Sequence, residues 1–272
     1  MIPDSRPFLS VCPRARPVIP NKFRPMPLHD SEAIVLRTYP LGDADRIVSF
    51  LTRSFGRLRG VAQGARRPKS RFGAALEPLT YLRVWFYERE TRDLVRVRQC
   101  EILESFLEVH NDYRCSMAMF LVAEISEAVL PEREPQDASF RLLLHVTRGI
   151  LQTRQPALAL GYFLVWTIRL AGWLPDLDRC SGCRRETAQQ PLYWLPTQPG
   201  LYCAQCRRPG IHVLSPETLV AARRMLTARL QELAADANSP RITPEFEAYF
   251  LSMIEHHIER RLASRRLYEE TR

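Results

Sequence analysis

The sequence lacks the motifs of the common nucleotide-dependent and hydrolytic enzymes. Its 272 residues contain no Gly-x-Gly-x-x-Gly segment and no Walker loop, the glycine-rich segments that hold nucleotide phosphates. No Ser, His and Asp set typical of a nucleophilic triad is recognisable. The adjacent His256 and His257 point to different sides of a helix and cannot readily share a metal ion. We therefore expect a protein that is not an enzyme.

Long apolar segments are scarce as well. The N-terminus carries prolines and arginines where a secretory signal would have an apolar stretch. The strongest candidate for a membrane span, 157–174, contains Arg169 and is short against the roughly 20 apolar residues that a span needs. We interpret this segment as a buried core helix. We expect a cytoplasmic protein, because the sequence contains cysteines in a metal-ligand pattern, and reduced thiols that serve as metal ligands are typical of a reducing compartment.

Four of the seven cysteines form one pattern. Cys180-Ser-Gly-Cys183 is followed, after nineteen residues, by Cys203-Ala-Gln-Cys206. Each Cys-x-x-Cys turn places two sulfurs on the same side of a tight knuckle, and two knuckles complete the tetrahedron that Zn²⁺ prefers. Because these ligands leave no coordination position open, we predict one structural Zn²⁺ per chain. Four unrelated buried thiols, or two disulfides, are the alternatives.

Positive charge is concentrated in the first part of the chain. Residues 1–100 contain 19 Lys and Arg against 9 Asp and Glu, a net charge of +10, whereas residues 101–272 contain 20 against 21. A basic half favours a polyanionic partner, with nucleic acid first and an anionic membrane surface second. Residues 1–29 hold seven prolines and show no periodicity. We predict that they form a disordered or loosely attached Pro/Arg-rich arm, which can be removed without loss of binding beyond a small electrostatic contribution.

Short alternating segments follow this arm. Their period of two, with turn residues between them, predicts strands. The predicted strands are 33–38, 46–52, 57–64, 79–87 and 94–100. Five short strands at this spacing favour a small closed barrel.

After residue 100 the hydrophobic period becomes helical. The predicted helices are 112–130, 138–151, 156–173, 215–233 and 243–269. The predicted fold class is therefore α+β and multidomain. We expect a five-stranded barrel at 30–104 and a mainly helical domain at 105–272, with the zinc module inserted at 179–209.

The densest basic run, residues 63–73, follows the third predicted strand. Small barrels bind single-stranded nucleic acid on a face framed by loops, where arginines contact phosphates and aromatic rings stack on bases. We therefore predict binding by this run and by arginines on the outer strand faces, with Phe55 as a further stacking candidate. The predicted DNA-binding residues are Arg37, Arg57, Arg59, Arg66, Arg67, Lys69, Arg71, Phe72, Arg96 and Arg98. A solvated charged loop without this role is the alternative.

One face of the fourth predicted strand carries Tyr81, Arg83, Trp85 and Tyr87. These side chains could form a stacking platform for bases, or they could pack against the helical domain. We favour packing, because a chain with two domains must cover part of the barrel surface.

Four segments of the first part of the chain form a recognisable series. In chain order they are Ala-Ile-Val-Leu-Arg-Thr at 33–38, Gly-Asp-Ala-Asp at 42–45, Leu-Thr-Arg-Ser-Phe-Gly-Arg-Leu at 51–58 and Gly-Ala-Arg-Arg-Pro-Lys-Ser-Arg-Phe-Gly at 64–73. These segments resemble the RecO family of bacterial recombination mediators. The order of two strands followed by this basic loop is more specific than any single Cys-x-x-Cys pair. The two Cys-x-x-Cys pairs within a helical part also resemble the family. The resemblance covers residues 31–272 and leaves out the arm.

The resemblance implies an OB-fold that binds single- and double-stranded DNA, anneals complementary strands and acts in DNA repair of the RecF-pathway type. It also implies cooperation with RecR and the single-strand-binding protein in loading RecA at the nucleoid. The competing interpretation is a zinc-stabilised transcription or RNA-binding factor, which would share the basic barrel but would not anneal strands. A zinc hydrolase would need an open metal position and a positioned base, and the sequence indicates neither.

Overall fold

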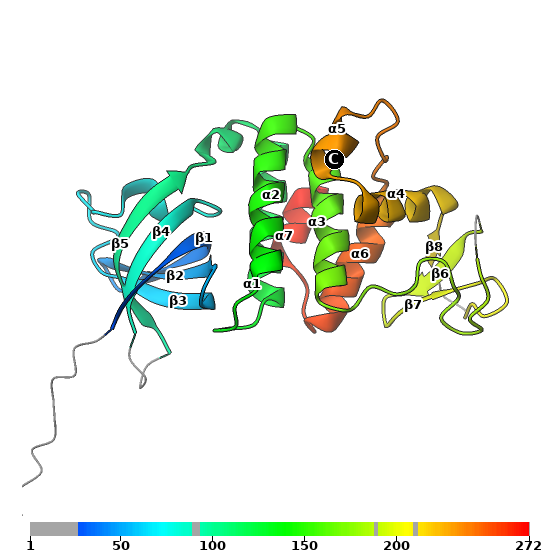
Figure 1. Ribbon diagram of the computed structural model, residues 1–272, viewed down its shortest axis with the longest axis horizontal. Coiled ribbons are helices and arrows are strands. Elements are labelled where there is room, and N and C mark those ends of the chain that lie inside the picture. The colour runs from blue at the N-terminus through cyan, green and yellow to red at the C-terminus, as the bar shows by residue number, and fades with distance from the viewer. Residues whose placement is uncertain (1–26, 89–92, 188–189, 209–211, 272) are drawn as a thin grey trace, which may run out of the picture.

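Figure 1 shows a computed structural model of the chain, in which residues 27–88, 93–187, 190–208 and 212–271 are described. A β-barrel, a group of helices and a small three-stranded sheet follow one another along the longest axis of the molecule. The predicted arm at 1–29 lies outside the described residues, apart from its last three positions.

Five strands close the barrel in the order β1-β2-β3-β5-β4, which confirms the predicted OB-type barrel. Neighbouring strands are antiparallel, except that β3 and β5 run parallel. The strands are β1 (Leu28–Leu41), β2 (Asp45–Thr52), β3 (Gly56–Ala62), β4 (Tyr81–Tyr87) and β5 (Val95–Glu104). The short helix η1 (Gly73–Leu76) lies between β3 and β4.

Strand β1 is buried on both faces in its middle, because it separates two hydrophobic cores. Ala33 and Val35 belong to the core inside the barrel. Ile34 and Leu36 alternate with them and belong to the core of the helical part. The alternation of side chains along a strand thus joins the barrel to the helices without any further linker.

The β2–β3 turn is a second point of attachment. Gly56 has a φ of 70°, and a Cβ at this position would collide with the backbone of Glu134. The backbone N–H of Arg133 donates to the carbonyl oxygen of Arg57 at 3.0 Å. Only glycine permits this conformation and this close approach. As a result, the segment that joins the first two long helices, which includes Arg133 and Glu134, can lie directly on the barrel.

The helices begin where the sequence provides caps. Asp112, Ser215 and Thr243 accept hydrogen bonds from backbone N–H groups in the first turns of α1, α4 and α6. The helices are η2 (Leu107–Asn111), α1 (Tyr113–Val129), α2 (Asp137–Thr153), α3 (Pro156–Leu170), α4 (Pro216–Thr227), α5 (Leu230–Ala235), α6 (Pro244–His257) and α7 (Ala263–Glu269). In the part of the chain that the structure describes, no helix is both long and apolar enough to cross a membrane. The segment interpreted as a core helix forms α3, where Leu160, Leu164 and Ile168 are fully buried.

Two predicted helices are each interrupted. The helix predicted at 215–233 ends at Thr227, and α5 starts at Leu230. The Leu230 side chain packs against Gly149, where an added Cβ would collide with it. The predicted helix 243–269 ends at His257, and α7 starts at Ala263. Both predictions of one continuous helix are wrong. In each case the second helix begins at a contact that is distant in sequence, with Gly149 for α5 and with Glu124 for α7.

A sheet that the sequence did not predict lies partly within the predicted zinc module at 179–209 and extends beyond it to residue 214. Strands β6 (Leu192–Leu195), β7 (Gln198–Tyr202) and β8 (His212–Leu214) pair in the order β7-β6-β8. Leu192, Trp194 and Leu201 are buried and join the helical core. The module is therefore packed onto the helices through its sheet.

The exposed face of β4 divides into two parts. The ring of Tyr81 lies 6.2 Å from that of Phe140 in α2, so the predicted packing against helices is confirmed there. Arg83 is exposed, and the prediction is wrong at that position. Trp85 and Tyr87 are half-buried.

Candidate metal centre and nucleic-acid interface

The four cysteines of the two Cys-x-x-Cys pairs meet at one point. The Sγ atoms of Cys180, Cys183, Cys203 and Cys206 all lie within 4.8 Å of one another. The Sγ atoms of Cys183 and Cys203 are 3.8 Å apart. Zn–S bonds of about 2.3 Å in a tetrahedron separate the sulfurs by roughly 3.8 Å, so this arrangement fits a Zn²⁺ ion.

The protein backbone prepares one of these thiols as a ligand. Burial raises the pKa of Cys180, but hydrogen bonds from the backbone N–H groups of Cys183, Cys203 and Gly182 favour the thiolate more strongly and lower the pKa to about 6. The N–H of Cys203 lies 3.3 Å from the Cys180 sulfur. A thiolate is the form that binds metal, so these hydrogen bonds favour the form of Cys180 that could serve as a ligand.

Gly182 allows the two knuckles to approach each other. A Cβ at this position would lie 3.3 Å from both the Cβ and the Sγ of Cys206. Cys180 and Cys203 are buried, whereas Cys183 is exposed. The sulfur cluster therefore lies close to the molecular surface, with two of its thiols buried and one exposed.

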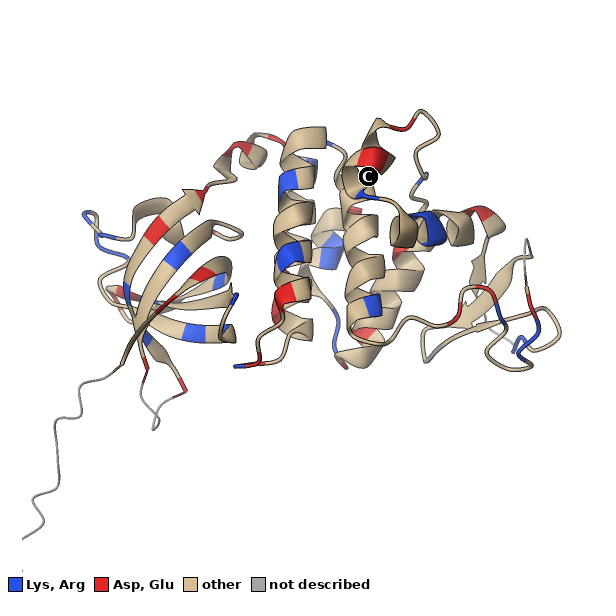
Figure 2. Ribbon diagram, in the orientation of Figure 1, with Lys and Arg blue, Asp and Glu red and all other residues tan. Residues whose placement is uncertain are grey.

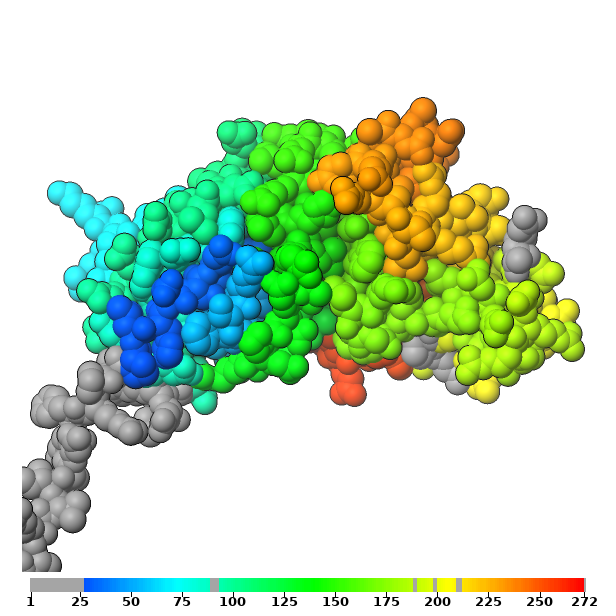
Figure 3. Space-filling model, viewed as in Figure 1, coloured from blue at the N-terminus to red at the C-terminus, as the bar shows by residue number. Residues whose placement is uncertain are grey.

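At the other end of the molecule, the predicted basic run forms an exposed loop between β3 and η1. Arg66, Arg67, Lys69 and Arg71 are all exposed. None of these four side chains makes an ion pair with any residue that the structure describes. Figure 3 shows the corresponding part of the chain projecting from the barrel end. Four cations without carboxylate partners give this basic loop the capacity to bind a polyanion.

The base of the basic loop is held by the β1–β2 turn. The N–H of Gly64 donates to Asp45 Oδ1 at 2.8 Å, and the N–H of Arg66 donates to the Ala44 carbonyl at 2.9 Å. The Arg66 guanidinium also donates to the carbonyl oxygen of Gly42 at 2.6 Å. The loop is therefore anchored at its start, and Arg67, Lys69 and Arg71 follow this anchor as exposed side chains.

The structure corrects the role predicted for Phe72. Its side chain is 3% exposed and belongs to the barrel core, with Ala75 and Leu76 beside it. The Arg71 guanidinium lies 4.9 Å from the ring centroid. No face of this ring is open to a base, so Phe72 is a core residue. Phe55 is half-buried, and its ring lies 5.3 Å from that of Phe86.

Two arginines of β5 extend the basic surface. Arg96 and Arg98 are exposed on the outer face of the barrel. Arg96 donates to Gln63 Oε1 at 2.8 Å, and Arg98 donates to the Tyr87 hydroxyl at 3.1 Å. These neutral acceptors position both side chains and leave their charge available. Arg96 borders the start of the basic loop through Gln63.

The remaining three predicted residues lie elsewhere, at the boundary with the helices. Arg57 donates to the Leu130 carbonyl oxygen at 2.9 Å and pairs with Glu132 at 3.1 Å, and Arg59 pairs with Glu132 at 3.2 Å. Arg37 lies 3.8 Å from Glu127. Carboxylates from the helical part thus neutralise much of this group. The sequence contains no signal for these pairs, because their partners are far apart in the chain.

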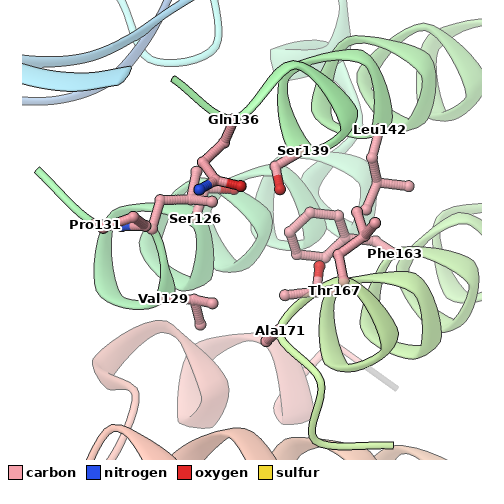
Figure 4. A pocket seen from close by; sticks show the side chains of 11 residues that line it. Ser126, Val129, Pro131, Gln136, Ser139, Leu142, Phe163, Thr167 and Ala171 are labelled. Atoms are coloured by element: carbon pink, nitrogen blue, oxygen red, sulfur yellow. The ribbon is translucent and has the colours of Figure 1, made fainter. Parts of the chain in front are cut away.

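A small cavity of about 130 Å³ lies between α1, α2 and α3 (Figure 4). Ser126, Gln136, Ser139 and Thr167 provide its polar lining, and Phe163 its largest apolar side chain. The lining includes hydroxyls and an amide but no carboxylate, histidine or cysteine. A group that could act as a general base is therefore missing from this cavity.

Comparison with known proteins decides the family. The family model "Recombination protein O N terminal" matches residues 26–106, and "Recombination protein O C terminal" matches residues 110–266. The chain belongs to the RecO family.

Individual RecO proteins resemble this chain over most of their length. A "DNA repair protein RecO" from Koribacter versatilis is 38% identical over 237 residues, which cover 87% of this chain and 96% of the relative. Proteins with the same description from Nocardioides sp. and Anaeromyxobacter sp. are 34% and 33% identical, covering 87% of this chain and 97% and 94% of the relatives. The resemblance predicted from the strand segments and the basic loop is confirmed, and with it a family that acts in DNA repair.

Proposed function

We propose that this protein is a DNA-binding recombination mediator that binds single- and double-stranded DNA and anneals complementary strands. The observation that carries the proposal is the basic loop, in which Arg66, Arg67, Lys69 and Arg71 are exposed without carboxylate partners among the described residues. Its position on an OB-type barrel of a RecO-family chain supports DNA as the polyanion.

Binding on this surface would depend on phosphates. Arg and Lys side chains contact phosphate oxygens of any sequence, so affinity would come from charge and from the release of counterions. Arg96 and Arg98 would extend the contacts along β5, next to the half-buried Tyr87. Arg37, Arg57 and Arg59 would contribute less, because Glu127 and Glu132 already pair with them.

We further propose that Cys180, Cys183, Cys203 and Cys206 hold one Zn²⁺ per chain. A metal bound by four thiolates has no open coordination position, so its contribution would be structural. It would fix the two knuckles against each other and against the sheet of the module. In line with the family, we propose a cytoplasmic, nucleoid-associated protein that cooperates with RecR and with the single-strand-binding protein in loading RecA.

The experiment replaces the four loop cations with alanine: R66A, R67A, K69A and R71A together. Each phosphate contact contributes a slope of about −0.7 to log K against log salt on single strands and about −0.9 on duplex. The variant should therefore flatten the slope by roughly two to four units if most of these side chains touch phosphate. It should also anneal complementary oligonucleotides more slowly, with or without bound single-strand-binding protein.

A matched control removes the same charge elsewhere. R114A, R169A, R241A and R266A together replace four exposed arginines of the helical part. This control should keep the salt slope and the annealing rate. A folded loop variant with unchanged affinity and slope would refute the assignment of the basic loop. Strong preference for one sequence, without annealing, would instead support a transcription or RNA-binding factor.

A further inference from the structure

Each cysteine pair of the zinc module is followed directly by two arginines. Cys183 precedes Arg184 and Arg185, and Cys206 precedes Arg207 and Arg208. Because the sulfurs of both pairs meet within 4.8 Å, the two arginine pairs begin at one surface cluster. The same short pattern, used twice, thus places four arginines directly next to the two cysteine knuckles.

The charge of these four arginines is not offset by any carboxylate in the described part of the chain. All four are exposed, and within the described residues none of them forms an ion pair. Arg179, just before the first knuckle, differs from them, because it pairs with Glu186 at 3.6 Å. Arg207 lies over the Tyr193 ring, 5.2 Å from its centroid. The contact with a half-buried aromatic ring orients this side chain without neutralising it.

The charge of the module differs from that of its surroundings. Residues 179–209 contain five arginines and one glutamate, whereas the other residues of 101–272 contain fifteen arginines against twenty acidic residues. A Zn²⁺ ion with four thiolates would carry a charge of about −2, which two arginines suffice to balance. A positive excess therefore remains at the module even when its metal is bound, in a half of the chain that is otherwise acidic.

The module and the basic loop lie at opposite ends of the molecule. Figure 1 places the barrel at one end of the longest axis and the β6–β8 sheet at the other. Figure 2 shows basic segments on loops at both ends, with mixed charges between them. Two basic surfaces separated in this way cannot act as one continuous patch.

We propose that Arg184, Arg185, Arg207 and Arg208 form a second DNA-binding surface, which holds a DNA segment separate from the one on the barrel. The inference rests on the proposed DNA binding by the barrel. An evenly charged polymer suits this surface, because DNA presents a phosphate at every step of its backbone and can contact both arginine pairs together. One molecule would then hold two DNA segments at the same time, one on the barrel and one at the zinc module.

The test measures bridging between two DNA molecules that cannot pair. The full-length protein is added to a bead-bound oligonucleotide, and capture of a second, labelled oligonucleotide of unrelated, non-complementary sequence is measured. The glutamine variant combines R184Q, R185Q, R207Q and R208Q. It should bind the first oligonucleotide nearly as well as the wild type. It should capture roughly tenfold less of the second, because several phosphate contacts are lost. The corresponding four-lysine variant should retain capture.

Loss of bridging must be distinguished from misfolding of the variant and from a general loss of positive charge. Zinc content and melting temperature show whether the glutamine variant still folds around its metal, and the R114A, R169A, R241A and R266A control should bridge normally. Bridging by the folded glutamine variant at the wild-type level would overturn the inference. The inference would also be overturned if the glutamine variant bridges DNA but no longer binds a polyglutamate peptide. The four arginines would then form a surface for an acidic protein. A wild-type protein that fails to bind even the first oligonucleotide would refute the proposed function itself.

Discussion

The Phe72 side chain lies beneath the basic loop as part of the barrel core. Its ring is 3% exposed, so F72A should leave a cavity and lower the free energy of unfolding by about 3–5 kcal/mol. Thermal melting should reveal this loss. At a temperature where the variant is folded, its affinity for single-stranded DNA should stay close to that of the wild type.

F72L serves as the control, because leucine fills much of the same volume and should recover most of the stability. The result that contradicts a core role is an unchanged melting temperature together with a loss of about 1–3 kcal/mol in single-strand affinity, which is the effect of a lost stacking contact.

Single residues also show the limits of reading a sequence. The exposure of Arg66 and Lys69 follows from their charge and from the turn residues around them, and the sequence predicts it. The burial of Phe72 does not follow, because an aromatic residue in a basic run suits both a core and a stacking surface. The partners of Arg57 and Arg59 depend on the path of a connection more than seventy residues away, which no local pattern specifies.

Among the helices, α7 is attached to α1 through one buried carboxylate. Glu124 accepts hydrogen bonds from the N–H groups of Ala263 at 3.0 Å and Ser264 at 2.7 Å, and it lies 3.3 Å from the Arg260 guanidinium. Burial alone would raise the pKa of Glu124, but these donors favour the carboxylate more strongly and lower it below its ordinary value. The negative charge also suits the N-terminal end of a helix.

Because the pKa of Glu124 is lower in the folded state, its stabilising contribution is present above about pH 4.3, the ordinary value, and is lost as the pH falls further. We expect E124Q to cost about 1–3 kcal/mol at pH 7, since two N–H groups and a guanidinium lose a charged acceptor. Denaturant unfolding at several pH values should show the gap between variant and wild type closing below pH 4. A gap that is constant with pH would contradict this role. E270Q is the control, because its carboxylate pairs with Arg266 on an exposed surface.

The proposed zinc module should bind its metal only when both Cys-x-x-Cys pairs are intact. C180S together with C183S should abolish zinc binding, measured by metal analysis of the purified protein. Two ligands cannot complete the tetrahedron, and metal binding is coupled to the folding of such modules. The sheet of the module should loosen locally, with faster amide exchange in Leu192–Leu195, while the barrel still binds DNA. C100S and C115S leave the cluster intact and should keep the metal. A wild-type protein that is folded but free of metal would refute the zinc proposal.

The elements that the sequence predicts are those with long, regular patterns. The five barrel strands and helices α1 to α3 follow from period-two and helical periodicity, with ends set by caps such as Asp112 and by Pro131. Strands β6 to β8 have at most five residues each, too few for a recognisable period. The gap before α7 is stabilised by Glu124, which lies some 140 residues earlier, so local sequence could not indicate it.

In the molecule as a whole, the barrel and the helices are not independent units. Ile34, Leu36, Leu51 and Leu79 come from the barrel, yet all four are buried in the core of the helical part. Full burial of such side chains contributes about 1.5–3 kcal/mol each, so the four together amount to roughly 6–12 kcal/mol as an upper estimate. That is comparable with the total stability of a typical domain, about 5–15 kcal/mol. The proposed division at 104/105 therefore separates two folds that share one interface.

A barrel fragment of residues 27–106 should consequently fold but self-associate, because it exposes the outer face of β1 and β2 that α1 normally covers. Sedimentation should show oligomers that grow with concentration.

The same fragment with I34T, L36T and L51T should stay monomeric, since threonine keeps β-propensity while removing most of the apolar surface. Both fragments should bind DNA through the basic loop. Their slope of log K against log salt should be close to the part of the slope that the barrel contributes in the full-length protein. In the full-length protein the three threonines should lower stability instead, because there the same side chains are buried. A wild-type fragment that stays monomeric at high concentration would show that the barrel does not depend on the helices to cover this face.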